Sequence, residues 1–370
     1  MKNVLIIHHF GGLGGAGKSL INNVRLLSGE CNLTVITPAH PNEILLLLKE
    51  FKNVRLRTSS FTPSVPIYSG GYNLLSPGLY LHLLKSITNL RSFFNLVKEQ
   101  ESDIIIVNSV IMSWISLFFW KQKKVCFVRE TKSKSMFNCL SRKLLNKFDL
   151  VCFISQFDSE SWSLQTDSVV NENSVDADLI KETRTSLPCK DEKKLHLVYL
   201  GGTSYIKGFY HLCLSLLMMK GSSRVNIYVL GTCRPIAIRI AQLIFGKSSP
   251  LTFVGKVQNV SDYYVRSVAV IFPVVKVHQG RPIFEAGQHR KGAIVPDFEN
   301  FREFVVNNVN GVIYKKRSSC SLANVLTLAA NGEFDFTYLG ECNFIRFKEK
   351  HSLGSAQLRA KYLISRIINI

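Results

Sequence analysis

Short apolar runs alternate with segments of helical periodicity along the chain, and this alternation is the feature that most constrains its fold. Strands that alternate with helices form a parallel sheet covered by helices, and strands buried on both faces read as continuous apolar runs. We therefore expect an α/β protein. The predicted strands are 4–8, 33–37, 54–57, 104–108, 125–129 and 150–154, then 195–200, 225–230, 251–254, 268–272, 293–296 and 312–314.

A polar, charged stretch at 177–194 divides these strands into two series. A length of 370 residues also suits two domains. We expect two Rossmann-like domains, 1–176 and 177–350, and a C-terminal helix at 351–370 that packs back on the first domain. Two doubly wound domains imply a cleft between them, and ligands in such folds bind at the carboxyl ends of the strands.

Three segments support more local expectations. Residues 54–57 alternate between apolar and polar side chains, which is typical of a strand at a sheet edge. The apolar residues of 83–97 share one helical face and predict a helix. Residues 61–78 are rich in Pro, Gly and Ser, and they predict a long loop that is either functional or a plain insertion.

The charge balance indicates an anionic partner. Lysine and arginine number 46 against 26 acidic residues, so the net charge is +20. Such an excess favours nucleic acid, an acidic membrane surface or a phosphorylated small molecule. The sequence contains no recognisable nucleic-acid-reading module, so we do not expect nucleic acid as the partner.

Cysteine usage and apolar content indicate a cytoplasmic protein. The nine cysteines are scattered without a CxxC pair, which predicts reduced thiols and no zinc site. The first residues lack a signal-peptide cleavage site. Residues 104–120 contain Asn108 and three serines and fall short of about 20 apolar residues, so we expect a buried strand and helix there and no membrane span.

Residues 12–19 read GLGGAGKS and satisfy the phosphate-loop pattern GxxxxGK[ST] between a predicted strand and a helix. A phosphate-loop nucleotide hydrolase, with Lys18 at the phosphates, is therefore the alternative function. Such a protein also needs a carboxylate at the end of an apolar strand to help hold Mg²⁺, and no clean run of this kind is found. We favour a glycine-rich turn in which Gly14 and Gly15 border a cleft.

Two glycine-containing loops in the second half follow predicted strands. The first carries Gly201 and Gly202, which would let a ligand approach the backbone, and then Lys207 at a helix start. A cation is unfavourable there unless an anion occupies the same place. In the second loop, His278, Gln279, Gly280 and Arg281 lead into a helix that carries Glu285, whose carboxylate is able to accept hydrogen bonds from ribose hydroxyls.

Residues 151–314 resemble the donor domain of glycosyltransferase family 4, a family of retaining enzymes with the two-domain GT-B architecture. The resemblance rests on elements that occur in the family's order and spacing. They are Ser155, Asn173 to Asp176, Gly201 with Lys207-Gly208, 226–231, Phe253-Val254-Gly255, Gly280 to Ala286, Glu303 and Asn310-Gly311. The first half resembles the acceptor domain through its glycine loop.

The resemblance implies a role for each matching residue. Lys207 would bind the donor diphosphate, Glu285 the ribose, and Gly280 would approach the donor sugar and phosphate. Gly14 and Gly15 would border the acceptor.

The sequence departs from the family at three positions. Gly202 replaces a diphosphate-binding arginine, for which Arg281 is the substitute that we favour over Lys276. Val277 replaces the first of two paired glutamates, which leaves sugar contacts to His278 or Gln279. Arg129-Glu130 stands where the family often has a histidine, and these changes leave the donor sugar open.

The implied function is transfer of a sugar from a nucleotide-sugar donor to a saccharide or lipid-linked saccharide acceptor in surface polysaccharide synthesis. Lys207, Arg281 and helix N-termini are able to stabilise the leaving diphosphate, so we expect no cofactor and no metal. The near match to an acidic metal motif, Asp176-Ala177-Asp178, lies by the linker.

The apolar residues of 136–148 recur at helical spacing and have basic neighbours. This stripe predicts either a core-facing helix or a helix on an anionic membrane.

Overall fold

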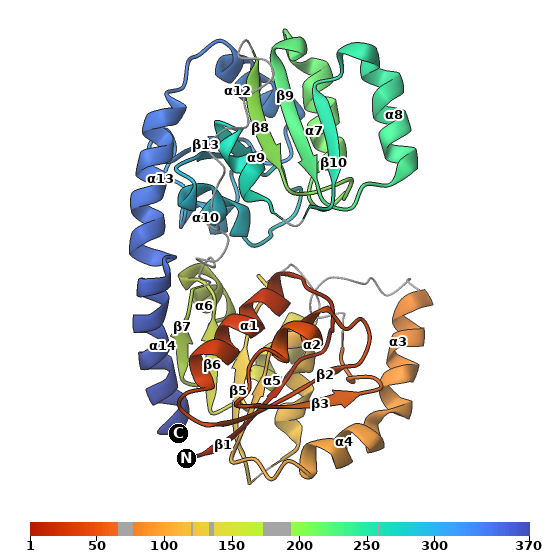
Figure 1. Cartoon of the computed structure of the whole chain (residues 1–370), viewed down its shortest axis with the longest axis vertical. Helices are drawn as coiled ribbons and strands as arrows, with labels where there is room; N and C mark the ends of the chain where they lie inside the picture. Colours follow the sequence, from red (N-terminus) through yellow and green to blue (C-terminus); the bar gives the residue numbers. More distant parts are fainter. Residues whose placement is uncertain (66–76, 120, 133–136, 173–193, 258) are drawn as a thin grey trace. The chain divides into compact units, whose positions relative to one another are not determined.

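The computed structural model describes residues 1–65, 77–119, 121–132, 137–172, 194–257 and 259–370 (Figure 1). The chain divides into two compact units. Unit 1 comprises Met1–Ser174 and Ala356–Ile370, and unit 2 comprises Val175–Ser355. Each unit has one parallel sheet, so the fold is the α/β fold with two Rossmann-like domains that the alternation of the sequence predicted.

The sheet of unit 1 has seven parallel strands in the order β3-β2-β1-β4-β5-β6-β7. The strand order reverses between β1 and β4, which is where ligands bind in doubly wound sheets. As predicted, β3 lies at an edge. The strands are β1 Asn3–Ile7, β2 Asn32–Pro38, β3 Val54–Ser59, β4 Ile104–Val107, β5 Lys123–Phe127, β6 Leu150–Phe153 and β7 Ser168–Val170.

Side chains of β1 alternate between two apolar cores on the two faces of this sheet. Val4 and Ile6 pack with α1, α2 and the C-terminal helix α14 (Leu353–Ile368), whereas Leu5 and Ile7 pack with α4, α5, α6 and a 3₁₀ helix. Strands with both faces covered account for the continuous apolar runs. The helices are α1 Gly15–Leu27, α2 Glu43–Leu48, α3 Pro77–Thr88, α4 Leu90–Lys98, the 3₁₀ helix η2 Val110–Leu117, α5 Asn138–Leu145 and α6 Gln156–Trp162.

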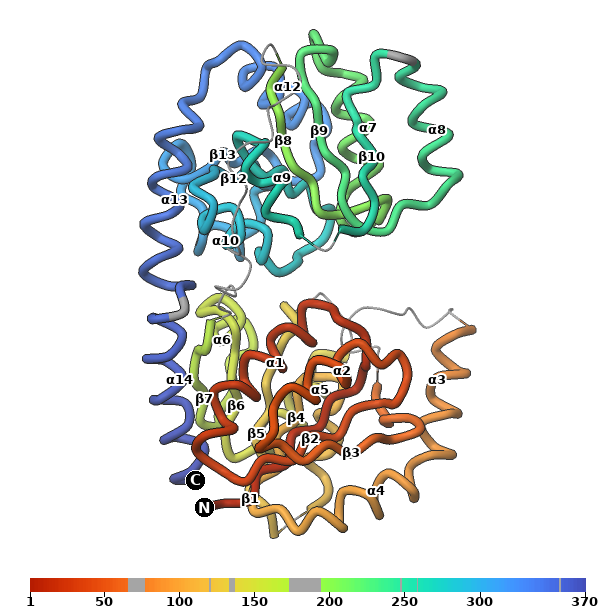
Figure 2. Tube along the Cα trace, in the orientation of Figure 1, coloured from red at the N-terminus to blue at the C-terminus, as the bar shows by residue number. Residues whose placement is uncertain are grey.

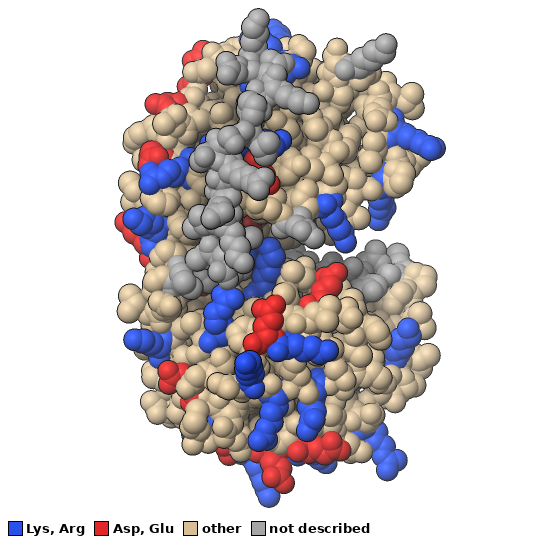
Figure 3. Space-filling view, viewed as in Figure 1, with Lys and Arg blue, Asp and Glu red and all other residues tan. Residues whose placement is uncertain are grey.

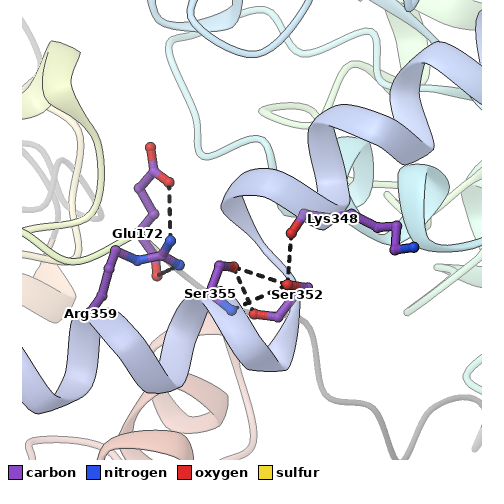
Figure 4. A network of polar contacts seen from close by, with 5 residues as sticks. All are labelled: Glu172, Lys348, Ser352, Ser355 and Arg359. Carbon is purple, nitrogen blue, oxygen red and sulfur yellow. Dashed lines mark hydrogen bonds and ion pairs between the residues drawn. The ribbon is translucent and has the colours of Figure 1, made fainter.

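The C-terminal helix α14 (Leu353–Ile368) packs on unit 1, as predicted. Leu363, Ile364 and Ile367 join the core beneath α1. Both termini lie together in Figure 2, and the Lys2 ammonium donates to the Ile368 carbonyl. Near the start of α14, the Ser352 hydroxyl accepts from the Ser355 amide at 3.3 Å, and one turn later Arg359 pairs with Glu172 at 3.8 Å (Figure 4).

The sheet of unit 2 has six parallel strands in the order β10-β9-β8-β11-β12-β13, with the reversal between β8 and β11. One face packs against α7, α8 and α12 and the other against α9, α10 and part of α13. The strands are β8 Leu195–Tyr199, β9 Val225–Leu230, β10 Leu251–Gly255, β11 Ala269–Ile271, β12 Gly292–Pro296 and β13 Gly311–Tyr314. The helices are α7 Phe209–Met218, α8 Pro235–Phe245, α9 Ser261–Val265, α10 Arg281–Gln288, α11 Glu299–Arg302, α12 Ser319–Ala330 and α13 Phe336–Lys350.

Local differences from the predictions have physical causes. The helix expected at 83–97 is divided into α3 and α4 at the single residue Asn89, whose backbone has φ −93° and ψ 0°. The Lys85 carbonyl accepts from both the backbone amide of Asn89, at 3.1 Å, and its side-chain amide, at 2.9 Å. In the stripe of 136–148, Leu144 and Phe148 are buried in the core, whereas Leu140 is exposed. Within the described residues, no helix is both long enough and apolar enough to span a membrane. Residues 66–76 of the predicted loop, and 173–193 with most of the linker and its acidic motif, lie outside the described part.

Candidate functional site

Two loops meet at the carboxyl edge of the second sheet, where β8 and β11 pair in parallel. The Val275 amide in the loop after β11 donates to the Ile206 carbonyl in the loop after β8, at 3.2 Å. Gly208 has φ +86°, and a Cβ there would lie 1.8 Å from the Pro273 carbonyl oxygen. Glycine is therefore required for the two loops to contact each other at the point where the strand order reverses.

Lys207 lies in the first of these loops, just before α7. The buried Tyr199 hydroxyl donates to the Lys207 carbonyl at 3.2 Å and fixes its backbone. The Lys207 ammonium lies 3.5 Å from the Leu200 carbonyl oxygen. Burial lowers the pKa of Lys207, while the nearby Glu285 carboxylate raises it. The ammonium is thus partly removed from water and within electrostatic range of Glu285.

Glu285 is buried on α10, and both of its carboxylate oxygens have partners. Arg281 Nε donates to Oε1 at 2.9 Å, and the Tyr264 hydroxyl lies 3.2 Å from Oε2. Burial and the Glu285 carboxylate raise the pKa of Tyr264 and keep the phenol protonated. Arg281 is the first residue of α10, where a cation opposes the helix dipole, and Glu285 one turn later offsets this cost. The sequence did not indicate Tyr264, because only the fold brings α9 against α10.

His278 lies beside this group of charges. Its Nδ1 lies 3.2 Å from the Gln279 carbonyl oxygen, which only accepts, so Nδ1 carries the proton. Burial lowers the pKa of His278, and the charge of Lys207 lowers it further. The Asn300 amide donates to the His278 carbonyl at 2.8 Å and holds the loop. The predicted residues Lys207, His278, Arg281 and Glu285 are therefore brought together, with His278 neutral at neutral pH.

Two helices begin at this edge of the sheet without side-chain caps. The N-cap residues are Gly208 for α7 and Gly280 for α10, and neither helix has an acidic residue in its first turn. Backbone amides at helix N-termini attract anions through the helix dipole. Together with the cationic groups of Lys207 and Arg281, these amides make an environment suited to a phosphate-bearing ligand.

Gly201 and Gly202 have a packing role that the sequence did not indicate. A Cβ on Gly201 would lie 1.9 Å from the Tyr199 hydroxyl, and one on Gly202, where φ is +55°, would lie 2.2 Å from the Thr232 carbonyl oxygen. The Gly202 amide donates to the Leu230 carbonyl at 2.8 Å. The protein itself thus occupies the space beside both glycines, which argues against the close ligand approach expected of them.

Two backbone amides of the glycine motif of unit 1 already have partners within the protein. The Leu13 amide donates to Glu43 Oε2 at 2.6 Å, and the Gly14 amide donates to the Gly12 carbonyl at 3.0 Å. The neighbouring strands β2 and β4 are followed by Ala39 and Asn108 and supply no carboxylate for Mg²⁺. The geometry favours the glycine-rich turn. Gly14 and Gly15 are exposed at its tip, with open space where a Cβ would stand.

A buried polar cluster occupies the carboxyl edge of the first sheet. Asn108 donates to His8 Nδ1 at 3.1 Å and accepts from Arg129 Nε at 3.0 Å. The Glu130 carboxylate accepts from the Val110 amide at 3.1 Å and from the Ser109 hydroxyl. The sequence analysis noted Arg129 and Glu130 but missed His8 and Asn108. Their position at the ends of two adjacent apolar strands was the available signal.

Acid is expected to destabilise unit 1 through its buried histidines. Burial lowers the pKa of His8 well below 6.5 and that of His9 to about 4. An unfolded histidine has the ordinary value, so below pH 6.5 the unfolded state binds more protons. The stabilisation is complete above that pH and is lost as the pH falls towards about 4, by up to about 1.4 kcal/mol per pH unit and histidine.

Urea unfolding at pH 7 and pH 5 tests this expectation. We predict that His8→Gln reduces the pH dependence of the free energy of unfolding, whereas the control His40→Gln, at an exposed residue, keeps that of the wild type. Equal pH dependence in all three proteins would contradict the prediction.

Solved structures similar to this chain are glycosyltransferases with two Rossmann-like domains. The Anabaena protein HepE, in complex with UDP, has 18% identity and TM-score 0.75, over 99% of this chain and 100% of HepE. Sucrose-phosphate synthase from Thermosynechococcus elongatus has 12% identity and TM-score 0.75, over 100% of both chains. The lipopolysaccharide outer core galactosyltransferase WaaB has 15% identity and TM-score 0.70, over 99% of this chain and 100% of WaaB.

These similarities define the fold of the chain as GT-B. The sequence matches no protein-family model and no curated protein. The fold is therefore established by structure, and the function is argued from the residues of the site.

Proposed function

We propose that this protein is a cytoplasmic retaining glycosyltransferase. It would move a sugar from a nucleotide-sugar donor to a saccharide or lipid-linked saccharide acceptor in surface polysaccharide synthesis. The observation that carries the proposal is the grouping of Lys207 and Arg281 with two uncapped helix N-termini at the reversal point of the second sheet. A nucleoside diphosphate is the leaving group that such an environment would bind and stabilise.

Each residue has a proposed role in transfer. The bond between the sugar C1 and the diphosphate oxygen breaks, a bond from C1 to the acceptor oxygen forms, and the proton of the acceptor hydroxyl passes to the departing diphosphate. Lys207 and Arg281 would stabilise the charge that develops on the diphosphate. Glu285, held by Arg281 and Tyr264, would accept hydrogen bonds from the ribose hydroxyls.

The residues expected to contact the sugar are those that differ most from the pattern of glycosyltransferase family 4. Val277 stands at the position of the first paired glutamate and is 37% exposed. Neutral His278 follows Val277, and because its Nδ1 proton is donated to the Gln279 carbonyl, its Nε2 is left as an acceptor for a sugar hydroxyl. Gln279 and Gly280 are next along the chain. We propose that His278 replaces the missing carboxylate in orienting the sugar hydroxyls.

The similar structures support this chemistry by what they bind or transfer. HepE is known in complex with UDP and with UDP-glucose, and WaaB is a galactosyltransferase of the lipopolysaccharide outer core. A phosphorylated donor also suits the net charge of +20. A lipid-linked acceptor and peripheral contact with the inner face of the plasma membrane belong to the same proposal.

A donor-consumption assay tests the proposal. The protein is incubated with hexose conjugates of UDP, GDP and ADP, with and without candidate acceptors, and release of the nucleoside diphosphate is measured. We expect release from one class of donor in wild type and in Lys220→Ala, which changes an exposed lysine beyond α7, but strongly reduced release in Lys207→Ala. NMR of the product would show the anomeric configuration of the donor retained. An inverted product would contradict the retaining mechanism, and equal activity in Lys207→Ala would contradict the site.

A further inference from the structure

Two neighbouring helices of unit 2 carry large apolar side chains on their outer faces. Helix α7 buries Phe209, Leu212 and Leu216 but exposes a row that repeats at helical spacing, namely Tyr210, Leu214, Leu217 and Met218. Helix α8 buries only two small residues, Ala237 and Ala241. The outer face of α8 carries a row of exposed apolar side chains with the same spacing as the row on α7, namely Ile236, Ile240, Leu243 and Ile244.

The exposure of these side chains is high for residues of this type. Leu243 is 85% exposed and Ile236 is 63% exposed. Contiguous apolar patches of this kind on a soluble protein mark sites of interaction. We call these two rows together the α7–α8 face.

The two rows lie on one face of the sheet. Helix α7 connects β8 to β9, and α8 connects β9 to β10, so crossovers of the same hand place them side by side. Their buried residues belong to a single core cluster. Beyond the start of α7, the exposed Tyr205 ring lies 6.5 Å from that of Tyr210 and extends the apolar surface.

The charged residues in the part of the sequence that contains α7 and α8 are all basic. Between Leu195 and Ser261 the sequence has seven lysine or arginine residues and no aspartate or glutamate. Lys220, Arg224, Arg234 and Arg239, which adjoin or belong to the two helices, are exposed. In the view of Figure 3, the part of unit 2 over α8 shows lysine and arginine but no acidic side chain. The partner of this face must therefore accept apolar side chains and carry negative charge.

We propose that the α7–α8 face binds the surface of an anionic lipid bilayer. The apolar rows would enter the boundary between headgroups and acyl chains, while the lysine and arginine side chains would meet headgroup phosphates. Tyr205 and Tyr210 are suited to the interfacial depth, where aromatic rings with a polar tip accumulate. The 136–148 stripe exposes Leu140 but buries Leu144 and Phe148, so the α7–α8 face exposes more large apolar side chains. The inference rests on the proposed function in that it names the surface for its membrane contact, but vesicle binding is measured without sugar transfer.

Vesicle co-sedimentation tests the inference with a pair of matched variants. The test variant is Ile240→Glu with Leu243→Glu on α8. The control is Tyr338→Glu with Ile345→Glu on α13, which removes two exposed apolar side chains and adds the same charge at a different helix. Circular dichroism and thermal unfolding check that both variants fold. The vesicles are phosphatidylcholine alone, or an equimolar mixture with phosphatidylglycerol.

The wild type is expected to bind the anionic vesicles at least about tenfold more tightly than the neutral ones, and less tightly as salt is added. The α8 variant should lose at least about tenfold in affinity, and the α13 variant should stay within about twofold of the wild type. Unchanged binding by the α8 variant would overturn the inference. The inference would also be overturned if the wild type did not bind vesicles and formed a dimer that the α8 substitutions converted to a monomer. The face would then join two copies of the chain.

Discussion

Lys207→Ala is expected to weaken binding of the nucleoside diphosphate by about ten- to one-hundredfold. Hydrogen bonds between an ammonium group and a phosphate are charge-assisted, and each contributes about 1.5–3 kcal/mol. Because the Lys207 ammonium is partly buried at the start of α7, water replaces its contribution poorly. Isothermal titration calorimetry with the preferred diphosphate measures the dissociation constant directly.

Lys220→Ala is the matched control for this prediction. Lys220 is exposed, follows the C-terminal end of the same helix and carries the same charge. Its removal changes the long-range field of the protein but not the local site, so the affinity should change by less than about twofold. Equal losses of affinity in the two variants would mean that Lys207 acts only through net charge.

Glu285→Ala is expected to lower the free energy of unfolding by about 3 kcal/mol. Breaking a buried ion pair by removing one partner leaves an uncompensated charge, at a cost of about 3–5 kcal/mol. The Arg281 side chain is 15% exposed, so partial hydration should keep the loss at the lower end of that range. The Tyr264 hydroxyl also loses its carboxylate partner. Urea unfolding of unliganded protein at neutral pH measures the change.

A double variant separates the broken pair from the loss of side-chain volume. In Arg281→Met with Glu285→Leu, no charge is left behind, and most of the lost stability should return. The exposed control Glu299→Ala should change the free energy of unfolding by less than about 1 kcal/mol. A double variant that is less stable than Glu285→Ala alone would contradict the prediction that the unpaired Arg281 charge causes the loss of stability.

The strands were predictable because they are buried on both faces. Residues 104–107 and 150–153 are continuous apolar runs, and each forms a strand within a residue or two of the prediction. Strand β7 was missed because it has only three residues and begins with an exposed serine. The break at Asn89 was missed because the apolar periodicity continues across a single residue whose backbone angles depart from those of a helix.

The candidate site residues were named from a resemblance to glycosyltransferase family 4, and their roles remain proposals. The sequence did not predict the ion pair of Arg281 with Glu285, although the two residues are one helical turn apart. Tyr264 was not predictable because it approaches from another helix. Gly201 and Gly202 were expected to let a ligand approach the backbone, but in the structure they are needed for packing. The sequence alone does not distinguish these two reasons for a glycine.

Thermal shift against a panel of nucleotides tests the central claim most directly. The panel contains UDP, GDP, ADP and their common sugar conjugates with EDTA, and ATP and GTP with Mg²⁺, for wild type, Lys207→Ala and Lys18→Ala. We predict stabilisation by one nucleoside diphosphate and its sugar conjugate without metal, lost in Lys207→Ala and kept in Lys18→Ala. Stabilisation only by a triphosphate with Mg²⁺, lost only in Lys18→Ala, would contradict the glycosyltransferase account and establish the glycine motif of unit 1 as a phosphate loop.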